Sequence, residues 1–351
     1  MSAYTAIDAI SPAIQRTRDF MFRPFKLGRF LKLALVATLT EGAFASVSSP
    51  GFPGSPGGKI PEFPAPHLSL PSMFMVLCVV AAVLLVVVPI LIFVSYLLLR
   101  LRFAFFDCVL FEQDQIGPAW GRYHEQALRY LWLSLGIAVG FWVVMVLGAG
   151  AALWKYRALL QSLFHGGTKQ WADFLPLFGI ALLLFFFVAL FGLVVDSTLN
   201  YFVLPHMALE DATAWQAIHD VWSEMKAEPL QFALFLIMRL ILPLVAGVIG
   251  AIAVFIPILL VAGILVVIGF ALHAVSQAVM IGYIIVAGAA FLALLVCAMI
   301  GVGGTIGTFM RNYALLFYGG RYPELARVLW PLPSLPSAPM MPGAGYPTGS
   351  F

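Results

Sequence analysis

Charged residues are scarce in this sequence. Only 10% of its 351 residues are Asp, Glu, Lys or Arg, while 62% are hydrophobic. A soluble globular domain carries about 25% charged residues, which cover the surface that faces water. The composition therefore excludes an ordinary soluble domain and indicates a protein that lies in a lipid bilayer.

The sequence also lacks the residue patterns on which most enzymes and metal sites depend. Its three cysteines, Cys78, Cys108 and Cys297, form no CxxC pair and are interpreted as packing residues. It has no HExxH pair, no GxxxxGK[ST] loop and no soluble stretch long enough for a catalytic domain. We therefore predict no catalytic residue, no cofactor and no metal, and we expect that the protein is not an enzyme.

Long apolar segments are abundant. Several reach 20 or more residues, which is enough for a helix to cross a bilayer core of about 30 Å. The runs are continuous rather than alternating, so we predict an all-α membrane protein rather than a barrel. The candidate spans are 30–47, 73–99, 131–153, 174–199, 230–253, 254–275 and 280–306.

A short motif occurs twice in the chain. Ala119-Trp120 and His124-Glu125 are followed, at an offset of 95 residues, by Ala214-Trp215 and His219-Asp220. A fainter copy opens the chain, where residues 11–19 align with residues 117–125. A repeat of this length indicates one building unit used several times. We predict three parallel units at about 8–102, 103–202 and 203–310.

Each unit is predicted to contain an interfacial amphipathic helix followed by a hairpin of two spans. In the third unit, helical periodicity aligns Trp215, Ile218, Trp222 and Met225 on one face. The same periodicity in the first unit places Ile14 and its apolar neighbours opposite the arginines. The interfacial helices are expected at 8–27, 103–130 and 209–228.

The repeated Trp and His residues have two interpretations. Trp120 and His124, like Trp215 and His219, are four residues apart and share a helix face, as a pair of ligands does. A metal site needs more converging ligands, however, and tryptophan favours the membrane–water interface. We expect all four side chains to be interfacial anchors.

The number of spans in the last third is open. If 254–275 is a span, the total is seven and the C-terminus lies outside the cell. The even number of spans in the first two units favours six, with 254–275 as a re-entrant or lengthened outer hairpin that breaks near Pro257 and Gly263. Basic residues after the last span also favour a cytoplasmic C-terminus, namely Arg311, Arg321 and Arg327.

We therefore predict about six spans in a single helical membrane domain, residues 1–330. A disordered, Pro-rich tail is expected at 331–351.

Basic residues crowd the N-terminal flank. Such a flank marks the cytoplasmic side of the cell (inner) membrane, and it is better suited to anionic lipids than to nucleic acid in a chain of this kind. We predict no nucleic-acid partner and cytoplasmic positions for both chain ends. The predicted lipid contacts are Arg16, Arg18, Arg23, Lys26 and Arg29.

Two charged residues inside spans are candidates for function, because an ionised group at the bilayer centre costs about 2.5–3.5 kcal/mol on insertion scales. They are Glu41 in the first span and Arg239 in the fifth. The repeat places them at similar depth, which favours an ion pair that faces the bundle interior. The alternative is that Glu41 lies at the outer mouth of a short span and Arg239 reaches back to the cytoplasmic surface.

Residues 11–13 (Ser-Pro-Ala), Phe22–Leu35 and Phe309–Leu315 resemble uncharacterised prokaryotic multi-pass families. These families are similar to the membrane domain found beside some bacterial glycerophosphoryl diester phosphodiesterases. The resemblance implies six spans. It implies no phosphodiesterase activity, because the catalytic domain is absent from this sequence.

Two classes of function fit these features. The first is a non-enzymatic membrane scaffold that organises lipids or binds a protein partner. The second is a transporter or channel for a small or lipid-like solute, acting through the Glu41 and Arg239 region. A cavity lined by these two residues favours the second class, and a dry apolar centre favours the first.

Overall fold

The computed structural model describes residues 4–42, 70–113, 115–155, 157, 175–274 and 276–331. All regular structure in these ranges is helical. The elements are α1 (Ile10–Phe22), α2 (Leu27–Ala37), the π-helix η1 (Thr38–Gly42), α3 (Leu70–Leu110), α4 (Ile116–Arg122), α5 (His124–Lys155), α7 (Leu175–Ser197), the π-helix η3 (Thr198–Val203), α8 (Leu204–Leu209), α9 (Ala214–Ala227), α10 (Pro229–His273), α11 (Gln277–Gly319) and α12 (Pro323–Leu329).

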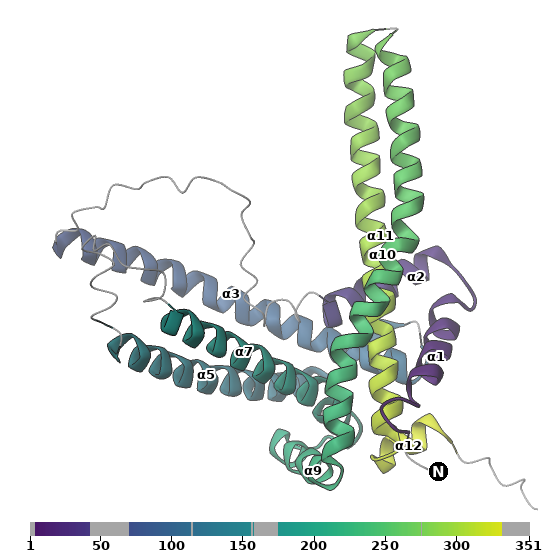
Figure 1. Ribbon diagram of the computed structural model, residues 1–351. Coiled ribbons are helices and arrows are strands. Elements are labelled where there is room, and N and C mark those ends of the chain that lie inside the picture. Colours follow the sequence, from purple (N-terminus) through teal and green to yellow (C-terminus); the bar gives the residue numbers. More distant parts are fainter. Residues whose placement is uncertain are drawn as a thin grey trace, which may run out of the picture.

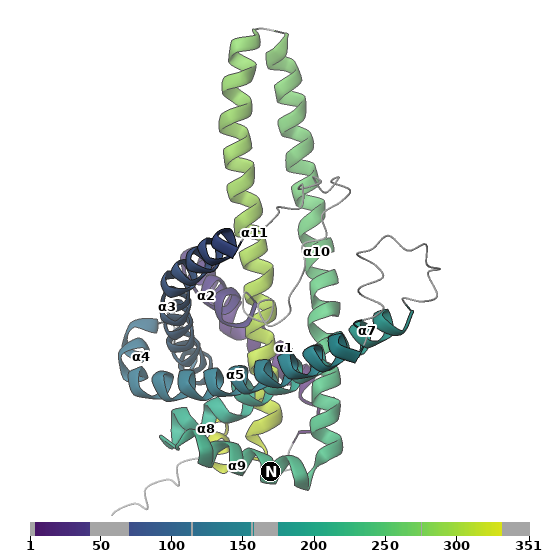
Figure 2. The same ribbon diagram turned by 90° about the vertical axis from the view of Figure 1, so that its left-hand side faces the viewer.

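The helices meet in one base, from which two arms extend (Figure 1). One arm contains α3, α5 and α7, and the other is the long hairpin of α10 and α11. The second view, turned by 90°, shows α1, α8 and α9 around the foot of the hairpin (Figure 2). The two ends of the described chain also meet at the base, where the rings of Tyr4 and Trp330 lie 6.0 Å apart.

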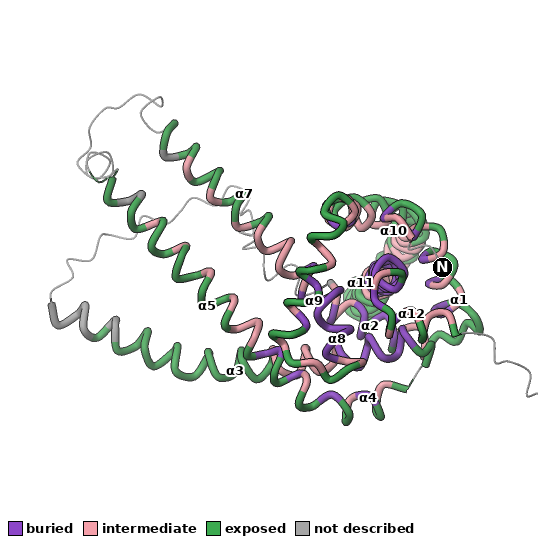
Figure 3. The backbone as a smooth tube through the Cα atoms, turned by 90° about the horizontal axis from the view of Figure 1, so that it is seen from below, coloured by how far each residue is buried: buried purple, intermediate pink, exposed green. Residues whose placement is uncertain are grey.

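Buried residues concentrate in this base, and the arms are mostly exposed (Figure 3). The last third of α11 is the centre of the base and packs against α1, α2, η1 and α10. Stacked aromatic rings fill the contact with α10. The centre of the Phe235 ring lies 4.7 Å from that of Phe317 and 5.2 Å from that of Tyr313. The base is therefore the packed core of the protein.

The arms expose large apolar side chains along their length. Within the described residues, five helices are long and apolar enough to cross a membrane: α3, α5, α7 with its continuation to Leu209, α10 and α11. An apolar surface of this kind suits helices that face lipid rather than water. With 45 residues, α10 is about 67 Å long at 1.5 Å per residue, which exceeds one crossing of the hydrocarbon core.

The prediction of a break in the segment 254–275 is wrong. The segment continues α10 without interruption through Pro257 and Gly263, so the structure has the lengthened hairpin and no re-entrant loop. Membrane helices tolerate proline because neighbouring groups satisfy the backbone that it leaves free. The first predicted span, 30–47, begins in α2 and continues into η1, and its last residues lie outside the described ranges, as does the predicted tail from residue 332 onwards.

Helices α1 and α9, two of the predicted interfacial helices, each bury one face in the base. Helix α1 buries Ala13, Thr17, Phe20 and Met21, whereas Ile14 is exposed. The buried face of α1 therefore combines small side chains with the large Phe20 and Met21, and side-chain size alone does not define it.

Helix α9 follows the same rule. It buries Ala217 and Val221 and leaves Trp215 and Trp222 exposed. A capping box between Thr213 and Gln216 fixes its start.

Helices α2 and α11 cross at very short distance. A Cβ atom added at Gly304 would lie 2.3 Å from the Cα atom of Ala34, and one at Gly303 would lie 3.2 Å from the Thr38 hydroxyl oxygen. Small residues permit such close contact between membrane helices. The glycines at residues 301, 303 and 304 therefore serve helix packing.

Replacement of Gly304 by alanine should destabilise the protein, because the new methyl group meets the backbone of α2. Overpacking of this kind costs about 1–3 kcal/mol. Gly288 lies in the same helix with open space around it, so Gly288→Ala should be neutral or stabilising by up to about 1 kcal/mol. Unfolding free energies in mixed micelles test the pair, and equal effects would contradict the close crossing.

Candidate functional site

Eight side chains with polar groups meet in the base and form what we call the polar cluster. Each of the five long helices supplies at least one of them, and the two π-helices supply the others. Figure 1 shows these elements converging where the arms join. The members are Glu41, Arg102, Tyr130, Asp196, Asn200, Tyr201, Arg239 and Arg311.

Glu41 and Arg311 form an ion pair at the centre of the cluster. The Arg311 Nη2 atom lies 2.5 Å from Oε1 of Glu41, and their side chains are only 1% and 6% exposed. The Tyr201 hydroxyl donates to the other carboxylate oxygen at 2.8 Å. Both oxygens of Glu41 are thus bonded, which is what a buried charge requires.

Arg311 also binds the backbone of η3, and the sequence explains why that backbone is free. In a π-helix the carbonyl of residue 200 should accept from the N–H of residue 205, but residue 205 is proline and has none. The Arg311 Nη1 atom donates to this Asn200 carbonyl at 2.7 Å. The side chain of α11 therefore replaces the missing backbone donor.

The Asn200 side chain connects three helices. Its amide oxygen accepts from the Tyr130 hydroxyl of α5 at 2.6 Å and from Arg102 of α3. Its amide nitrogen donates to Asp196 of α7. An asparagine that acts as donor and acceptor at once fixes the relative positions of these helices.

Arg239 of α10 binds α7. It donates to the Asp196 carboxylate, to the Ser197 hydroxyl and, at 3.3 Å, to the Leu193 carbonyl. The Tyr201 ring lies between two guanidinium groups, 4.8 Å from that of Arg239 and 5.3 Å from that of Arg311. Cation–π contact of this kind stabilises positive charge away from water.

The structure brings both predicted residues, Glu41 and Arg239, into the same cluster, but each has another partner. Glu41 pairs with Arg311 and Arg239 pairs with Asp196. Neither interpretation from the sequence included Arg311, which was assigned to the basic flank after the last span. The missed signal is the apolar run from Tyr313 to Tyr318, which continues the helix beyond Arg311.

Arg102 follows the predicted span 73–99, a position at which a basic residue usually marks the cytoplasmic surface, yet it lies inside the base. Its Nε and Nη2 atoms donate to the Thr40 carbonyl at 3.1 and 2.6 Å. This carbonyl belongs to the last turn of η1, where helix carbonyls have no partner within the helix. Four residues that follow Arg102, Phe103 to Phe106, are fully buried.

The predicted anchors lie at the edge of the base. His124 and His219 are exposed, and Trp215 is 78% exposed. Trp120 is partly covered, with the Arg100 guanidinium 4.8 Å from its ring and bonded to its carbonyl at 2.6 Å. Their role as membrane anchors stays a prediction.

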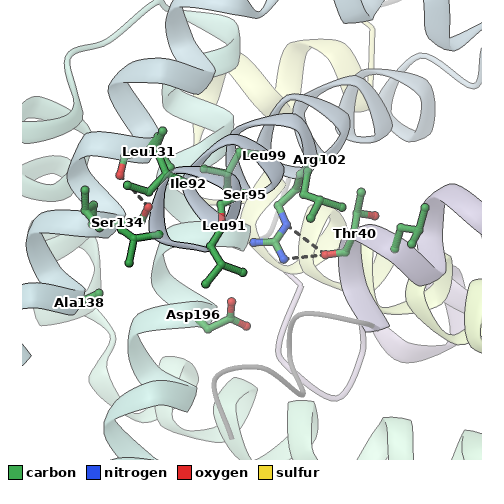
Figure 4. A pocket seen from close by; sticks show the side chains of 14 residues that line it. Thr40, Leu91, Ile92, Ser95, Leu99, Arg102, Leu131, Ser134, Ala138 and Asp196 are labelled. Atoms are coloured by element: carbon green, nitrogen blue, oxygen red, sulfur yellow. Dashed lines mark hydrogen bonds between the residues drawn. The ribbon is translucent and has the colours of Figure 1, made fainter. Parts of the chain in front are cut away.

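Two cavities flank the polar cluster. The first, which we call the α3–α5 cavity, has a volume of about 490 Å³ and is lined by Arg102, Asp196 and apolar residues of α3 and α5 (Figure 4). The second, the α7–α10 cavity, has a volume of about 680 Å³ and is lined by Glu41, Tyr201 and Arg239 together with apolar residues of α7, α10 and α11. Within the described ranges, no three His, Cys, Asp or Glu side chains gather as metal ligands.

A second polar group lies where α8, α9, α11 and α12 meet. The His206 ring and the Tyr318 hydroxyl are hydrogen-bonded at 2.7 Å. Glu224 lies beside them, and burial raises the pKa of its carboxyl group to about 6, while Tyr318 and Arg321 oppose the rise. This carboxyl group is thus close to its titration range at neutral pH.

One residue of the basic flank has a structural role. Arg16 donates to the carbonyls of Val109 and Leu110, at 3.2 and 2.9 Å, and so caps the end of α3. Burial lowers the pKa of its guanidinium. Arg18 and Arg23 are exposed, each within 4 Å of Asp19.

Loss of Arg311 or Glu41 alone should be severe, because the partner stays buried without its counter-charge. We expect Arg311→Leu and Glu41→Leu each to cost about 3–5 kcal/mol of stability, and the double variant to recover part of the loss. Unfolding in mixed micelles gives the coupling energy. The exposed pair Glu324–Arg327 is the matched control and should contribute at most about 1 kcal/mol. Additive losses at Glu41 and Arg311 would argue against the pair.

The protein should lose stability as the pH rises through about 6, the pKa of Glu224. A carboxyl group whose pKa is raised by folding holds its proton more tightly in the folded state, so its contribution is full below pH 4.5 and lost above pH 6. Glu224→Gln should therefore be about 1 kcal/mol more stable than the parent at pH 7.5, after allowance for solvent screening, and equal to it at pH 4.

Thermal or denaturant unfolding between pH 4 and pH 8 measures this difference. Glu125, whose side chain is 78% exposed, provides the control variant Glu125→Gln, which should follow the parent at every pH. A Glu224→Gln variant that keeps the pH dependence of the parent would assign that dependence to another group.

The family model of DUF7544 matches residues 4–328, which include the whole polar cluster. No curated protein and no solved structure matches the chain. Nothing in the match connects the chain with the membrane domains found beside glycerophosphoryl diester phosphodiesterases, so that resemblance gains no support. Because the match covers nearly the whole chain, the protein belongs to DUF7544, a family of unknown function.

Proposed function

We propose that the protein is a non-enzymatic membrane scaffold that organises lipids around its arms. The observation that carries this proposal is the closed polar cluster, in which one residue from each long helix is bonded to another. Such a cluster holds the base in one arrangement. The arms that extend from it present apolar side chains over most of their surface, so they determine which lipids lie between them.

The state of the two carboxylates supports a non-enzymatic role. Asp196 and Glu41 each contact a guanidinium group and a second donor. A general base must be free to accept a proton from a substrate. Carboxylates held in this way are poorly suited to that task.

The positions of the chain ends support an even number of crossings. Tyr4 and Trp330 are in contact, and Arg321 donates to the Tyr4 carbonyl at 3.1 Å. Two ends that meet on one side of a membrane require an even number of crossings between them. We infer that the segment of α2 and η1 joins the five long helices as a short sixth span, in three parallel units with both ends in the cytoplasm.

The basic flank fits this orientation. Arg18, Arg23 and Lys26 are exposed next to the base. Anionic lipids of the cytoplasmic leaflet attract such residues by about 1 kcal/mol each. We propose that these residues hold the base against that leaflet of the cell membrane.

A transporter for a lipid-like solute is the alternative, and one observation favours it. The α7–α10 cavity is lined by Glu41 and Arg239, the residues from which this function was inferred. Asp196 and Tyr201 also line it, and the rest of the lining is mostly apolar, so a solute that enters there must carry an apolar part.

Full-length protein in liposomes of phosphatidylglycerol and phosphatidylcholine distinguishes the two functions. The scaffold should bring fluorescent phosphatidylglycerol molecules together, detected as self-quenching, without moving lipid or solute across the bilayer. Replacement of Arg18 and Arg23 by glutamine should weaken the clustering at least about tenfold if each contributes about 1 kcal/mol. Replacement of Arg327, which is basic and 73% exposed, is the control.

The alternative function has a different signature in the same liposomes. A transporter should give flux of lipid or solute across the bilayer, and Arg239→Gln should abolish that flux. Flux of this kind would overturn the scaffold proposal, whereas its absence together with clustering supports it.

A further inference from the structure

The polar cluster carries one positive charge more than its partners neutralise. It contains three guanidinium groups, on Arg102, Arg239 and Arg311, and two carboxylates, on Glu41 and Asp196. Each carboxylate lies against one arginine, and Arg102 donates only to neutral oxygen atoms. An uncompensated charge inside a membrane protein is costly and marks a site that needs an anion.

Arg102 still has donors to offer. A guanidinium group carries five N–H groups, and three of those on Arg102 bond to Thr40 and Asn200. The Tyr130 hydroxyl is within hydrogen-bond reach of this guanidinium group, so it can accept one of the remaining two. Arg102 therefore keeps at least one N–H group on a terminal nitrogen for an oxyanion.

The guanidinium group of Arg102 lines the α3–α5 cavity, opposite Asp196 (Figure 4). The Asp196 carboxylate is already counted against Arg239, with which it forms an ion pair, so the cluster of three guanidinium groups and two carboxylates keeps its excess positive charge. The Ser95 hydroxyl lines the same cavity as a further donor. The cavity volume of about 490 Å³ falls in the usual range for small-molecule sites, about 300–1,000 Å³.

Polarity changes along this cavity in one direction. Helix α3 runs toward the base and α5 runs away from it, so Arg102 marks the base end and Val88 and Ala138 mark the outer end. From the base outward the lining of the cavity changes from charged to apolar. The Ser134 hydroxyl does not interrupt this change, because it donates to the backbone carbonyl of Leu131 in the same helix. A lipid has the same order, with its charge at the membrane surface and its chain toward the centre.

We propose that the α3–α5 cavity binds an anionic lipid, whose headgroup oxyanion accepts hydrogen bonds from Arg102 and whose acyl chain lies along Leu91 and Ala138. This inference deepens the proposed lipid-organising function and names the lipid class and the site. The bound headgroup supplies the negative charge that the cluster lacks. The lipid also fills the space between α3 and α5, so binding stabilises the arm.

The test measures thermal unfolding of the full-length protein in neutral detergent, titrated with phosphatidylglycerol, phosphatidylcholine or inorganic phosphate. Phosphatidylglycerol should raise the melting temperature in a saturable manner, and the other two should not. Arg102→Gln should weaken the response at least about tenfold, because a hydrogen bond to a charged group contributes about 1.5–3 kcal/mol.

A second variant tests the site without changing its charge. Ala138→Phe fills the outer end of the cavity, and Val139→Phe places the same ring on the adjacent residue, which is exposed and outside the cavity lining. Both variants should fold, because both positions are on the apolar arm. Only Ala138→Phe should lose the response to phosphatidylglycerol.

Three results would overturn the proposal. Equal stabilisation by phosphatidylcholine would show that the headgroup charge is not recognised. A response to phosphate alone would assign Arg102 to a free oxyanion instead of a lipid. An unchanged response in Ala138→Phe would place the lipid elsewhere. If one of these results is found while the protein still clusters phosphatidylglycerol in liposomes, the inference is rejected and the proposed function stands.

Discussion

The arrangement of this protein depends on a small group of hydrogen-bonded charges in its base. Apolar helices gain little from contact with one another in lipid, because lipid tails are as apolar as leucine. Association must therefore come from close packing and from polar bonds. Here Arg102, Tyr130, Asp196, Arg239 and Arg311 each belong to a different long helix, and all five are bonded within one cluster.

The backbone of the base is adapted to this cluster. Both π-helices, η1 and η3, lie beside it and supply backbone carbonyls to arginine side chains. At η3 the reason is a single proline, Pro205, which removes the N–H that would have satisfied Asn200. Single turns of π-helix are frequent at functional sites. Proline and arginine are thus complementary here: the first frees an acceptor and the second supplies the donor.

The general architecture could be predicted from composition because hydrophobic runs report helix length directly. The all-helical class and most long helices follow from them, and the two charged residues singled out within the spans, Glu41 and Arg239, both lie in the polar cluster. The pairing did not follow. From the sequence, Arg102 and Arg311 are each interpreted as flanking charges, because positive residues near the ends of spans usually face the cytoplasm. Only the fold reveals that α3 and α11 continue past them into the base.

Helix faces were equally hard to predict, for a physical reason. In a soluble protein the bulkiest apolar face of a helix is the buried one, whereas here lipid accepts bulky residues and the close contacts select small ones. Helix α9 accordingly buries alanine and valine and exposes two tryptophans, whereas α1 exposes Ile14 but buries Phe20 and Met21 beside Ala13 and Thr17. The same rule explains Gly304 at the crossing of α2 and α11. Periodicity located these helices along the chain, but it could not say which side faces the core.

The two arms contact each other chiefly through the base. The two arms leave the base in different directions (Figure 1). The cluster lies where they meet, with Arg239 and Asp196 joining α10 to α7. Lipids between the arms then experience a fixed positive centre at one end and apolar helix surfaces along their chains. In the function that we propose, this arrangement selects lipids by their headgroup charge at the base.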